Sequence, residues 1–123
     1  MARNHNAQLG RRGERAARRF VRRLGWRIVA RNWYCRPLGE IDIVALDRAT
    51  LVFLEVKSRQ PDAASVPEDA MRPAKLDHLR RLALTFLRQY NLGQLAYRFD
   101  VLAVTVQPWP WPCRVVHYEN AFV

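Results

Sequence analysis

The stretch GEIDIVALDRATLVFLEVKSR, residues 39–59, decides the fold because it predicts a β-hairpin with polar groups at one end. The connection between its two apolar segments holds four residues at most, which suits only an antiparallel turn. A turn of two or four residues makes Val44 face Phe53. Counting along both strands away from the turn then places Asp42 opposite Glu55. Like charges directly opposed in a sheet are destabilising, because their Cβ atoms lie about 5 Å apart. The hairpin therefore predicts two carboxylates that need a partner.

Two such carboxylates can share a proton, recruit cationic side chains or coordinate a cation. Carboxylate oxygens favour Mg²⁺ or Mn²⁺, which also bind phosphates. Lys57 follows Glu55 by two residues and lies on the same strand face, where its ammonium would reach a phosphate or an attacking water. Structural alternatives are a cross-strand pair of Lys57 with Glu40, and carboxylates paired with arginines. We favour a metal site formed by Asp42 and Glu55.

A first helix is predicted from about residue 7 to residue 24, where apolar positions recur at three- and four-residue steps and Gly25 suits the end. Glu14 lies beside Val21 at the margin of the apolar face, where it can lean toward whatever packs against the helix. Its alternative role is an intrahelical pair with Arg18 or Arg11. The opposite face carries a cluster of arginines.

The charge of the chain points to a polyanionic partner. The 123 residues are 50% hydrophobic, enough for one domain, and carry a formal charge of +10. Glu14 is the only acidic residue before Glu40, so the positive charge is concentrated in the first helix. Candidate contacts to nucleic-acid phosphates are Arg11, Arg12, Arg15, Arg18, Arg19, Arg22, Arg59 and Lys75.

The remaining segments complete an α/β pattern. A strand is predicted at residues 26–34, before the hairpin. A polar loop with a helical turn after Pro67 leads to a second helix that begins at Pro73, and Lys75 lies at the edge of its apolar face. Residues 97–106 predict a strand covered on both faces, and a last strand begins near Arg114.

The connection QPWPWPC carries Trp109 and Trp111 between prolines. These tryptophans could form a stiff exposed binding patch, but we expect them to pack at the edge of the core. Cys35 and Cys113 lack the spacing of a zinc site and are interpreted as free thiols. No apolar run approaches the length of a membrane span, and no secretory signal is present, so a soluble cytoplasmic protein is expected.

Three motifs, GERAARRFVRRLGWRIVARN, GEIDIVALD and LVFLEVKSR, together with RFDVLAV and ENAF, resemble the YraN family of small bacterial proteins over nearly the whole chain. Residues 10–59 are similar in order to archaeal Holliday-junction resolvases and the PD-(D/E)xK nuclease superfamily. This resemblance implies a restriction-endonuclease-like α/β fold: a mixed central sheet flanked by helices, in the order α-β-β-β-α-β-β. It also implies that Glu14, Asp42, Glu55 and Lys57 match the motif residues, while Ile41 replaces the motif proline.

A single nuclease-like domain, residues 1–123, is thus expected to hydrolyse phosphodiester bonds in branched or damaged DNA. Asp42, Glu55 and Glu14 would hold Mg²⁺ or Mn²⁺, and Lys57 would orient the nucleophile. DNA is favoured over RNA as the partner, and a homodimer would suit a two-fold symmetric substrate. The alternative from another functional class is a nucleic-acid-binding adaptor that keeps the fold without catalysis.

Overall fold

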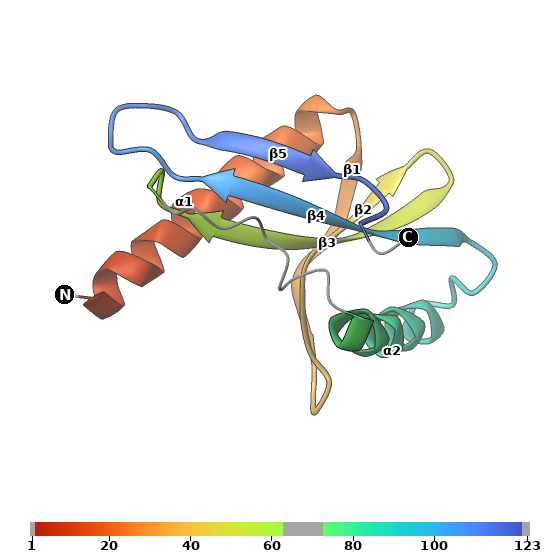
Figure 1. Ribbon diagram of the computed structural model, residues 1–123. Helices are drawn as coiled ribbons and strands as arrows, with labels where there is room; N and C mark the ends of the chain where they lie inside the picture. Colours follow the sequence, from red (N-terminus) through yellow and green to blue (C-terminus); the bar gives the residue numbers. More distant parts are fainter. Residues whose placement is uncertain (1, 63–72, 122–123) are drawn as a thin grey trace.

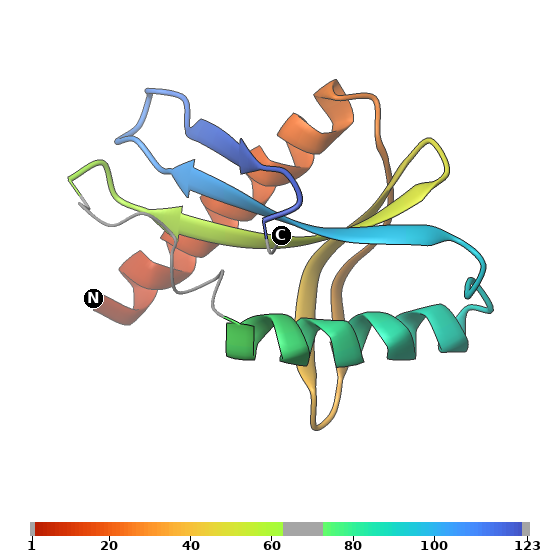
Figure 2. The same cartoon turned by 45° about the vertical axis from the view of Figure 1, so that its right-hand side comes forward.

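Five strands form one mixed sheet in the order β1-β2-β3-β4-β5, with a helix packed on each face (Figures 1 and 2). The computed structural model describes residues 2–62 and 73–121. Strands β3 and β4 are parallel, and the other neighbouring pairs are antiparallel. The elements are α1 (Ala2–Arg23), β1 (Arg27–Cys35), β2 (Gly39–Asp47), β3 (Thr50–Arg59), α2 (Pro73–Gln89), β4 (Ala96–Thr105) and β5 (Arg114–Tyr118).

The predicted fold class and element order are confirmed, and the boundaries differ by a few residues. Helix α1 begins at Ala2, earlier than the predicted start near residue 7. The helical turn predicted after Pro67 lies outside the described residues. A parallel pair needs a long crossover, and the segment between β3 and β4 supplies one that contains α2.

Two hydrophobic clusters occupy the two faces of the sheet. Helix α2 packs against one face through Leu82 and Phe86, which meet Phe53 of β3. Helix α1 packs against the other face through Ala17 and Val21. Strands β3 and β4 are therefore covered on both sides, which explains the runs of consecutive buried apolar residues at 51–54 in β3 and 101–104 in β4.

Strand β2 changes direction at Asp42. Side chains of a regular strand alternate between faces, so Ile41 and Ile43 should share a face. Instead Ile41 belongs to the α2 cluster and Ile43 to the α1 cluster, both nearly fully buried. Beyond this point β2 stays paired with β1, and the two form an arm that projects from the sheet (Figure 1). The bend leaves Asp42 at the place where β2 separates from β3.

Helix α1 approaches β3 closely because residue 13 is glycine. A Cβ atom at Gly13 would lie 2.8 Å from Ser58 Cβ and would overlap Ser58 Oγ. Rotation of the serine hydroxyl would relieve the second contact, but the first involves an atom fixed by the backbone of β3. Glu14, the next residue, is thereby held beside the sheet.

A buried ionic network joins β4 to β5. Asp100 is almost fully buried and contacts His117 at 2.7 Å, the Asn120 N–H at 2.9 Å and Arg98 at 3.1 Å. Burial acts to raise the pKa of Asp100, but hydrogen bonds from these three partners outweigh it and lower the pKa. Within the described part of the chain every buried side-chain N or O atom has a hydrogen-bond partner. We assign this network to stability, since its groups satisfy one another.

Substituting Gly13→Ala tests the close contact of α1 with β3. Alanine favours a helix over glycine by about 1 kcal/mol, but overpacking against Ser58 should lower the free energy of unfolding by about 1–3 kcal/mol. The matched background is Ser58→Gly, which removes the obstructing atoms. There Gly13→Ala should be neutral or stabilising in urea denaturation. Equal destabilisation in both backgrounds would show that the contact does not constrain the helix.

Candidate metal centre

Asp42 accepts a backbone hydrogen bond where the ladder between β2 and β3 ends. The predicted pair Val44–Phe53 is confirmed, but the ladder stops at Ile43–Leu54. The direct pairing of Asp42 with Glu55 is therefore a wrong prediction. Because β2 bends away, Asp42 Oδ2 instead accepts the Val56 N–H at 2.7 Å. The carboxylate takes over a ladder position that a backbone carbonyl would otherwise fill.

The electrostatic surroundings of Asp42 disfavour its charge. Burial is the largest effect and raises its pKa to about 7, from an ordinary value of 3.8. The Val56 N–H favours the charged form and acts in the opposite direction, while Glu55, Glu40 and Glu14 raise the pKa further. The two other predicted carboxylates, Glu55 and Glu14, together with Glu40, thus all act on Asp42. The charges that influence Asp42 most are all negative.

Glu55, unlike Asp42, has positively charged neighbours. Its Oε1 atom lies 3.7 Å from the Lys57 ammonium and 3.5 Å from the Lys75 ammonium, and its side chain is only 11% exposed. Lys57 is 46% exposed and lies on the predicted face of β3 beside Glu55. Lys75, predicted to contact phosphates, is at the start of α2 next to the same carboxylate. Both ammonium groups therefore lie close to the Oε1 atom of Glu55.

The chemistry of this set suits a hard divalent cation. Mg²⁺ is commonly held by one or two carboxylates together with waters and substrate phosphates, so Asp42 and Glu55 would suffice. Among residues 2–62 and 73–121, no group of three or more His, Cys, Asp or Glu side chains is arranged to hold a metal ion. Asp42 and Glu55 could hold such an ion only together with further ligands, such as waters or substrate phosphates.

Glu40 was missed as a site residue in the sequence because it seemed only a cross-strand partner for Lys57. Its place two residues before Asp42 in the sequence was the available signal. Its effect on Asp42 depends on the separation of β2 from β3, which the hairpin pattern did not reveal. Glu14, on α1, is near enough to Asp42 to contribute to raising its pKa.

The predicted arginines separate into two groups around α1. Arg12, Arg15 and Arg19 line a groove toward β5, whereas Arg22 lines a shallower pocket with β1. Burial and then the nearby Arg31 lower the pKa of Arg18, which places Arg18 toward β1 as well. Two further residues predicted to contact phosphates differ in exposure. Arg11 is exposed on α1, and Arg59 is partly buried at the end of β3.

Trp109 and Trp111 do not pack at the edge of the core. Their side chains are 85% and 66% exposed, so this prediction is wrong and the alternative of an exposed patch holds. Cys35 and Cys113 are free thiols, as expected. Among the described residues, neither helix combines the length and apolar character needed to cross a membrane.

Comparison with known proteins gives matches over most of the chain. Residues 13–104 match a family described as "Uncharacterised protein family UPF0102". A UPF0102 protein of Geobacter sulfurreducens is 43% identical over 97% of this chain and 91% of its own length. A second, from Syntrophus aciditrophicus, is 38% identical over 95% of this chain and 90% of its own length. A third, from an Arthrobacter strain, is 49% identical over 78% of this chain and 80% of its own length.

Substituting Asp42→Asn should stabilise the protein above neutral pH. Because the folded pKa of about 7 exceeds the ordinary 3.8, folded protein binds more protons than unfolded chain between these values. The free energy of unfolding of the wild type should therefore fall as pH rises through this window, by roughly 4 kcal/mol at most. Asparagine keeps an acceptor for the Val56 N–H without the charge.

Urea denaturation without divalent metal checks this effect. The Asp42→Asn protein should be more stable than the wild type at pH 8.5 and about equally stable at pH 4. The exposed Asp62→Asn exchange is the matched control and should change stability little at either pH. A destabilised Asp42→Asn protein at pH 8.5 would contradict the charge balance described here.

Proposed function

The chain belongs to the UPF0102 family, and from this premise we propose that it is a divalent-metal-dependent nuclease that acts on branched or damaged DNA. Membership agrees with the resemblance to YraN proteins, and the fold agrees with a restriction-endonuclease-like architecture. The observation that carries the proposal is the raised pKa of Asp42, caused by burial and by the three carboxylates around it. A cation bound at Asp42 would offset the repulsion among these carboxylates. The ammonium of Lys57 lies beside one of them, Glu55.

Asp42 and Glu55 would hold Mg²⁺ or Mn²⁺ through carboxylate oxygens, with Glu14 and Glu40 adding negative charge around the ion. A bound divalent metal supplies Lewis-acid stabilisation of the negative charge that develops on a phosphate during hydrolysis. The hydrogen bond from Val56 fixes the orientation of the Asp42 carboxylate, since it engages Oδ2. That fixed orientation reduces the reorganisation needed when the substrate binds.

Lys57 is the residue best placed to act on the water nucleophile. In the hydrolysis the water oxygen bonds to phosphorus, the bond from phosphorus to one bridging oxygen breaks, and a water proton passes to solvent as the leaving oxygen is protonated. The half-exposed ammonium of Lys57 would donate a hydrogen bond to the water or to a non-bridging phosphate oxygen. Lys75, whose ammonium lies 3.5 Å from the Glu55 carboxylate, would contact the same phosphate.

The arginines of α1 support selection by DNA structure. Guanidinium groups contact phosphates, which carry no base sequence directly, so these contacts fix the position of DNA without reading bases. Carboxylates at the bend of β2 and arginines on a neighbouring helix would engage different parts of one substrate. A branched or distorted molecule meets that requirement.

Cleavage assays test the proposal directly. Purified protein with Mn²⁺ should cut branched DNA, and Asp42→Ala or Glu55→Gln should each abolish the cleavage. Lys57→Ala should lower the rate by about 10²–10³-fold, the usual cost of removing one hydrogen-bond donor that stabilises developing negative charge. Asp62→Asn is the matched acidic control and should cleave as the wild type. Absence of cleavage above the Asp42→Ala background across hairpins, flaps and four-way junctions would reject the proposal.

A second function is favoured by the two lysines at Glu55. They neutralise that carboxylate without a metal, as expected if the chain only binds nucleic acid and acts as an adaptor. Calorimetry separates the functions: a nuclease gives heat on Mn²⁺ addition that Glu55→Gln removes. Absence of that heat, with DNA binding that weakens steeply with salt, would favour the adaptor.

A further inference from the structure

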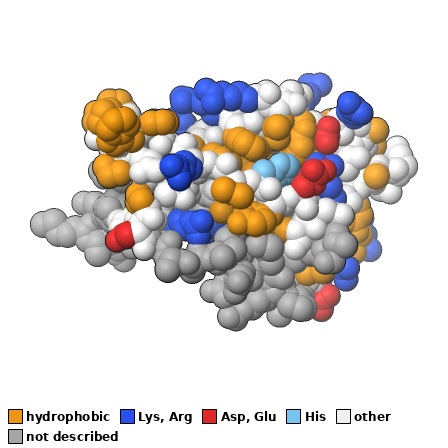
Figure 3. Space-filling view, turned by 45° about the horizontal axis from the view of Figure 1, so that its top comes forward, with side chains coloured by type: hydrophobic (Ala, Val, Ile, Leu, Met, Phe, Trp, Pro, Cys, Tyr) orange, Lys and Arg blue, Asp and Glu red, His pale blue; other side chains and the backbone are white. Residues whose placement is uncertain are grey.

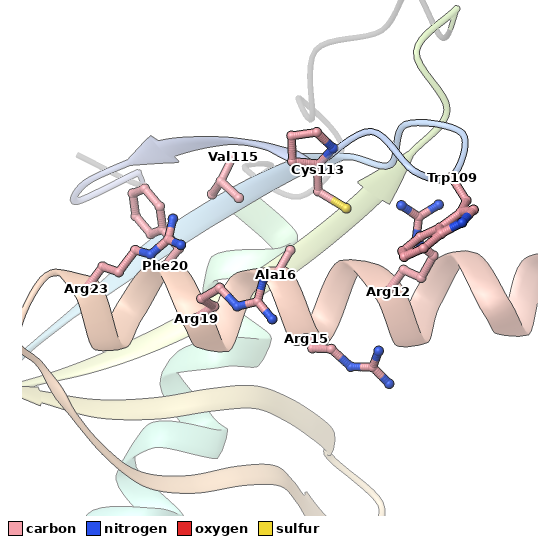
Figure 4. Close-up of a pocket in the computed structure, with 10 residues that line it drawn as sticks. Arg12, Arg15, Ala16, Arg19, Phe20, Arg23, Trp109, Cys113 and Val115 are labelled. Carbon is pink, nitrogen blue, oxygen red and sulfur yellow. The ribbon is translucent and has the colours of Figure 1, made fainter.

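A groove of about 410 Å³ lies between α1 and the loop that joins β4 to β5 (Figure 4). One wall is the helix, and the other is formed by the loop and the start of β5. Figure 4 shows Trp109 and Arg12 at one end of the groove, and Arg23 with Phe20 at the other. Neither Trp109 nor Arg23 was among the predicted site residues.

The helical wall is strongly positive. Arg12, Arg15, Arg19 and Arg23 line the groove, and the described residues that line it include no acidic side chain. Their spacing of three and four residues places them along one stripe of α1. At 1.5 Å per residue the stripe is about 16 Å long, enough for several successive phosphates. In the space-filling view, Lys and Arg side chains follow the upper edge beside a hydrophobic cluster at the left end (Figure 3).

The loop holds Trp109 in place through its backbone. The Trp111 N–H donates to the Pro108 carbonyl at 2.9 Å, and the Arg12 guanidinium donates to the carbonyl of Gln107 and, at 3.4 Å, to that of Trp111. The loop is therefore anchored to α1, while the indole of Trp109 remains 85% exposed. The backbone of the loop therefore needs little ordering before a flat ring stacks on the exposed indole.

We propose that this groove binds a single-stranded segment of nucleic acid, with phosphates on the arginines and an unpaired base stacked on Trp109. Aromatic side chains next to a positive groove are the general means of binding single strands. A duplex would meet the arginines equally well, but its bases are stacked on one another and offer no free face to Trp109. The single strand is therefore the occupant that uses both features of the groove.

The groove and the carboxylates lie on different sides of α1. Around the helix, positions 12, 16, 19 and 23 fall close together, and Glu14 lies about half a turn from them. A strand in the groove would thus be an unpaired arm of the DNA, away from the phosphate that is cut. In naming this arm the inference rests on the proposed nuclease function, whereas binding itself requires neither metal nor cleavage.

Fluorescence anisotropy in EDTA tests the inference with labelled oligothymidine and a labelled duplex of equal length. Trp109→Ala should weaken binding of the single strand by about 5–150-fold, the range for loss of one stacked base. Binding of the duplex should change less than two-fold, and Trp109→Phe should retain most of the affinity. Trp111→Ala is the matched control, because Trp111 is exposed in the same loop but does not line the groove.

Arg19→Ala should weaken binding of both oligonucleotides and should reduce the slope of log affinity against log salt by about 1. Equal affinities of the Trp109→Ala and Trp111→Ala proteins for the single strand would overturn the inference, and an acidic peptide that competes for the groove would then indicate a protein partner. The Asp42→Asn protein separates this binding test from the cleavage assay, since it should bind the single strand normally in EDTA. Cleavage can therefore be absent while the groove still binds the single strand, and cleavage can persist when binding in the groove is lost.

Discussion

The hydrogen bond from the Val56 N–H to the Asp42 carboxylate, at 2.7 Å, lies at the point on which the rest of the site depends. It closes the ladder after Ile43–Leu54 and lets β2 leave β3 without exposing an unpaired amide. The same bend draws Asp42 into a partly buried position, where burial raises its pKa. One backbone contact therefore connects the shape of the sheet with the chemistry of the carboxylate.

The accumulation of negative charge has a physical cost that a structural role does not explain. Asp100 shows how this fold stabilises a buried carboxylate, since Arg98, His117 and a backbone amide surround it. Among the residues that the structure describes, Asp42 has one backbone donor, and its strongest neighbouring charges repel it. The carboxylates of Asp42 and Asp100 thus have opposite surroundings, and the proposed cation would offset the repulsion at Asp42.

Sequence reasoning reached the fold because its main signals are local. The short connection fixed the register through Val44–Phe53, and the apolar stripe defined α1. It could not predict that the ladder ends before Asp42, because a bend in a strand depends on packing against both helices. The exposure of Trp109 was missed for a similar reason: anchoring of its loop by Arg12 joins residues nearly a hundred positions apart.

The protonation of Asp42 measures the central claim most directly. Carboxyl ¹³C chemical shifts of this residue, followed by NMR against pH with and without saturating Mg²⁺, report its charge without depending on a substrate. The account predicts a midpoint near pH 7 in the absence of metal, and a clear move to lower pH when the ion binds. An ordinary acidic midpoint that Mg²⁺ leaves unchanged would contradict it.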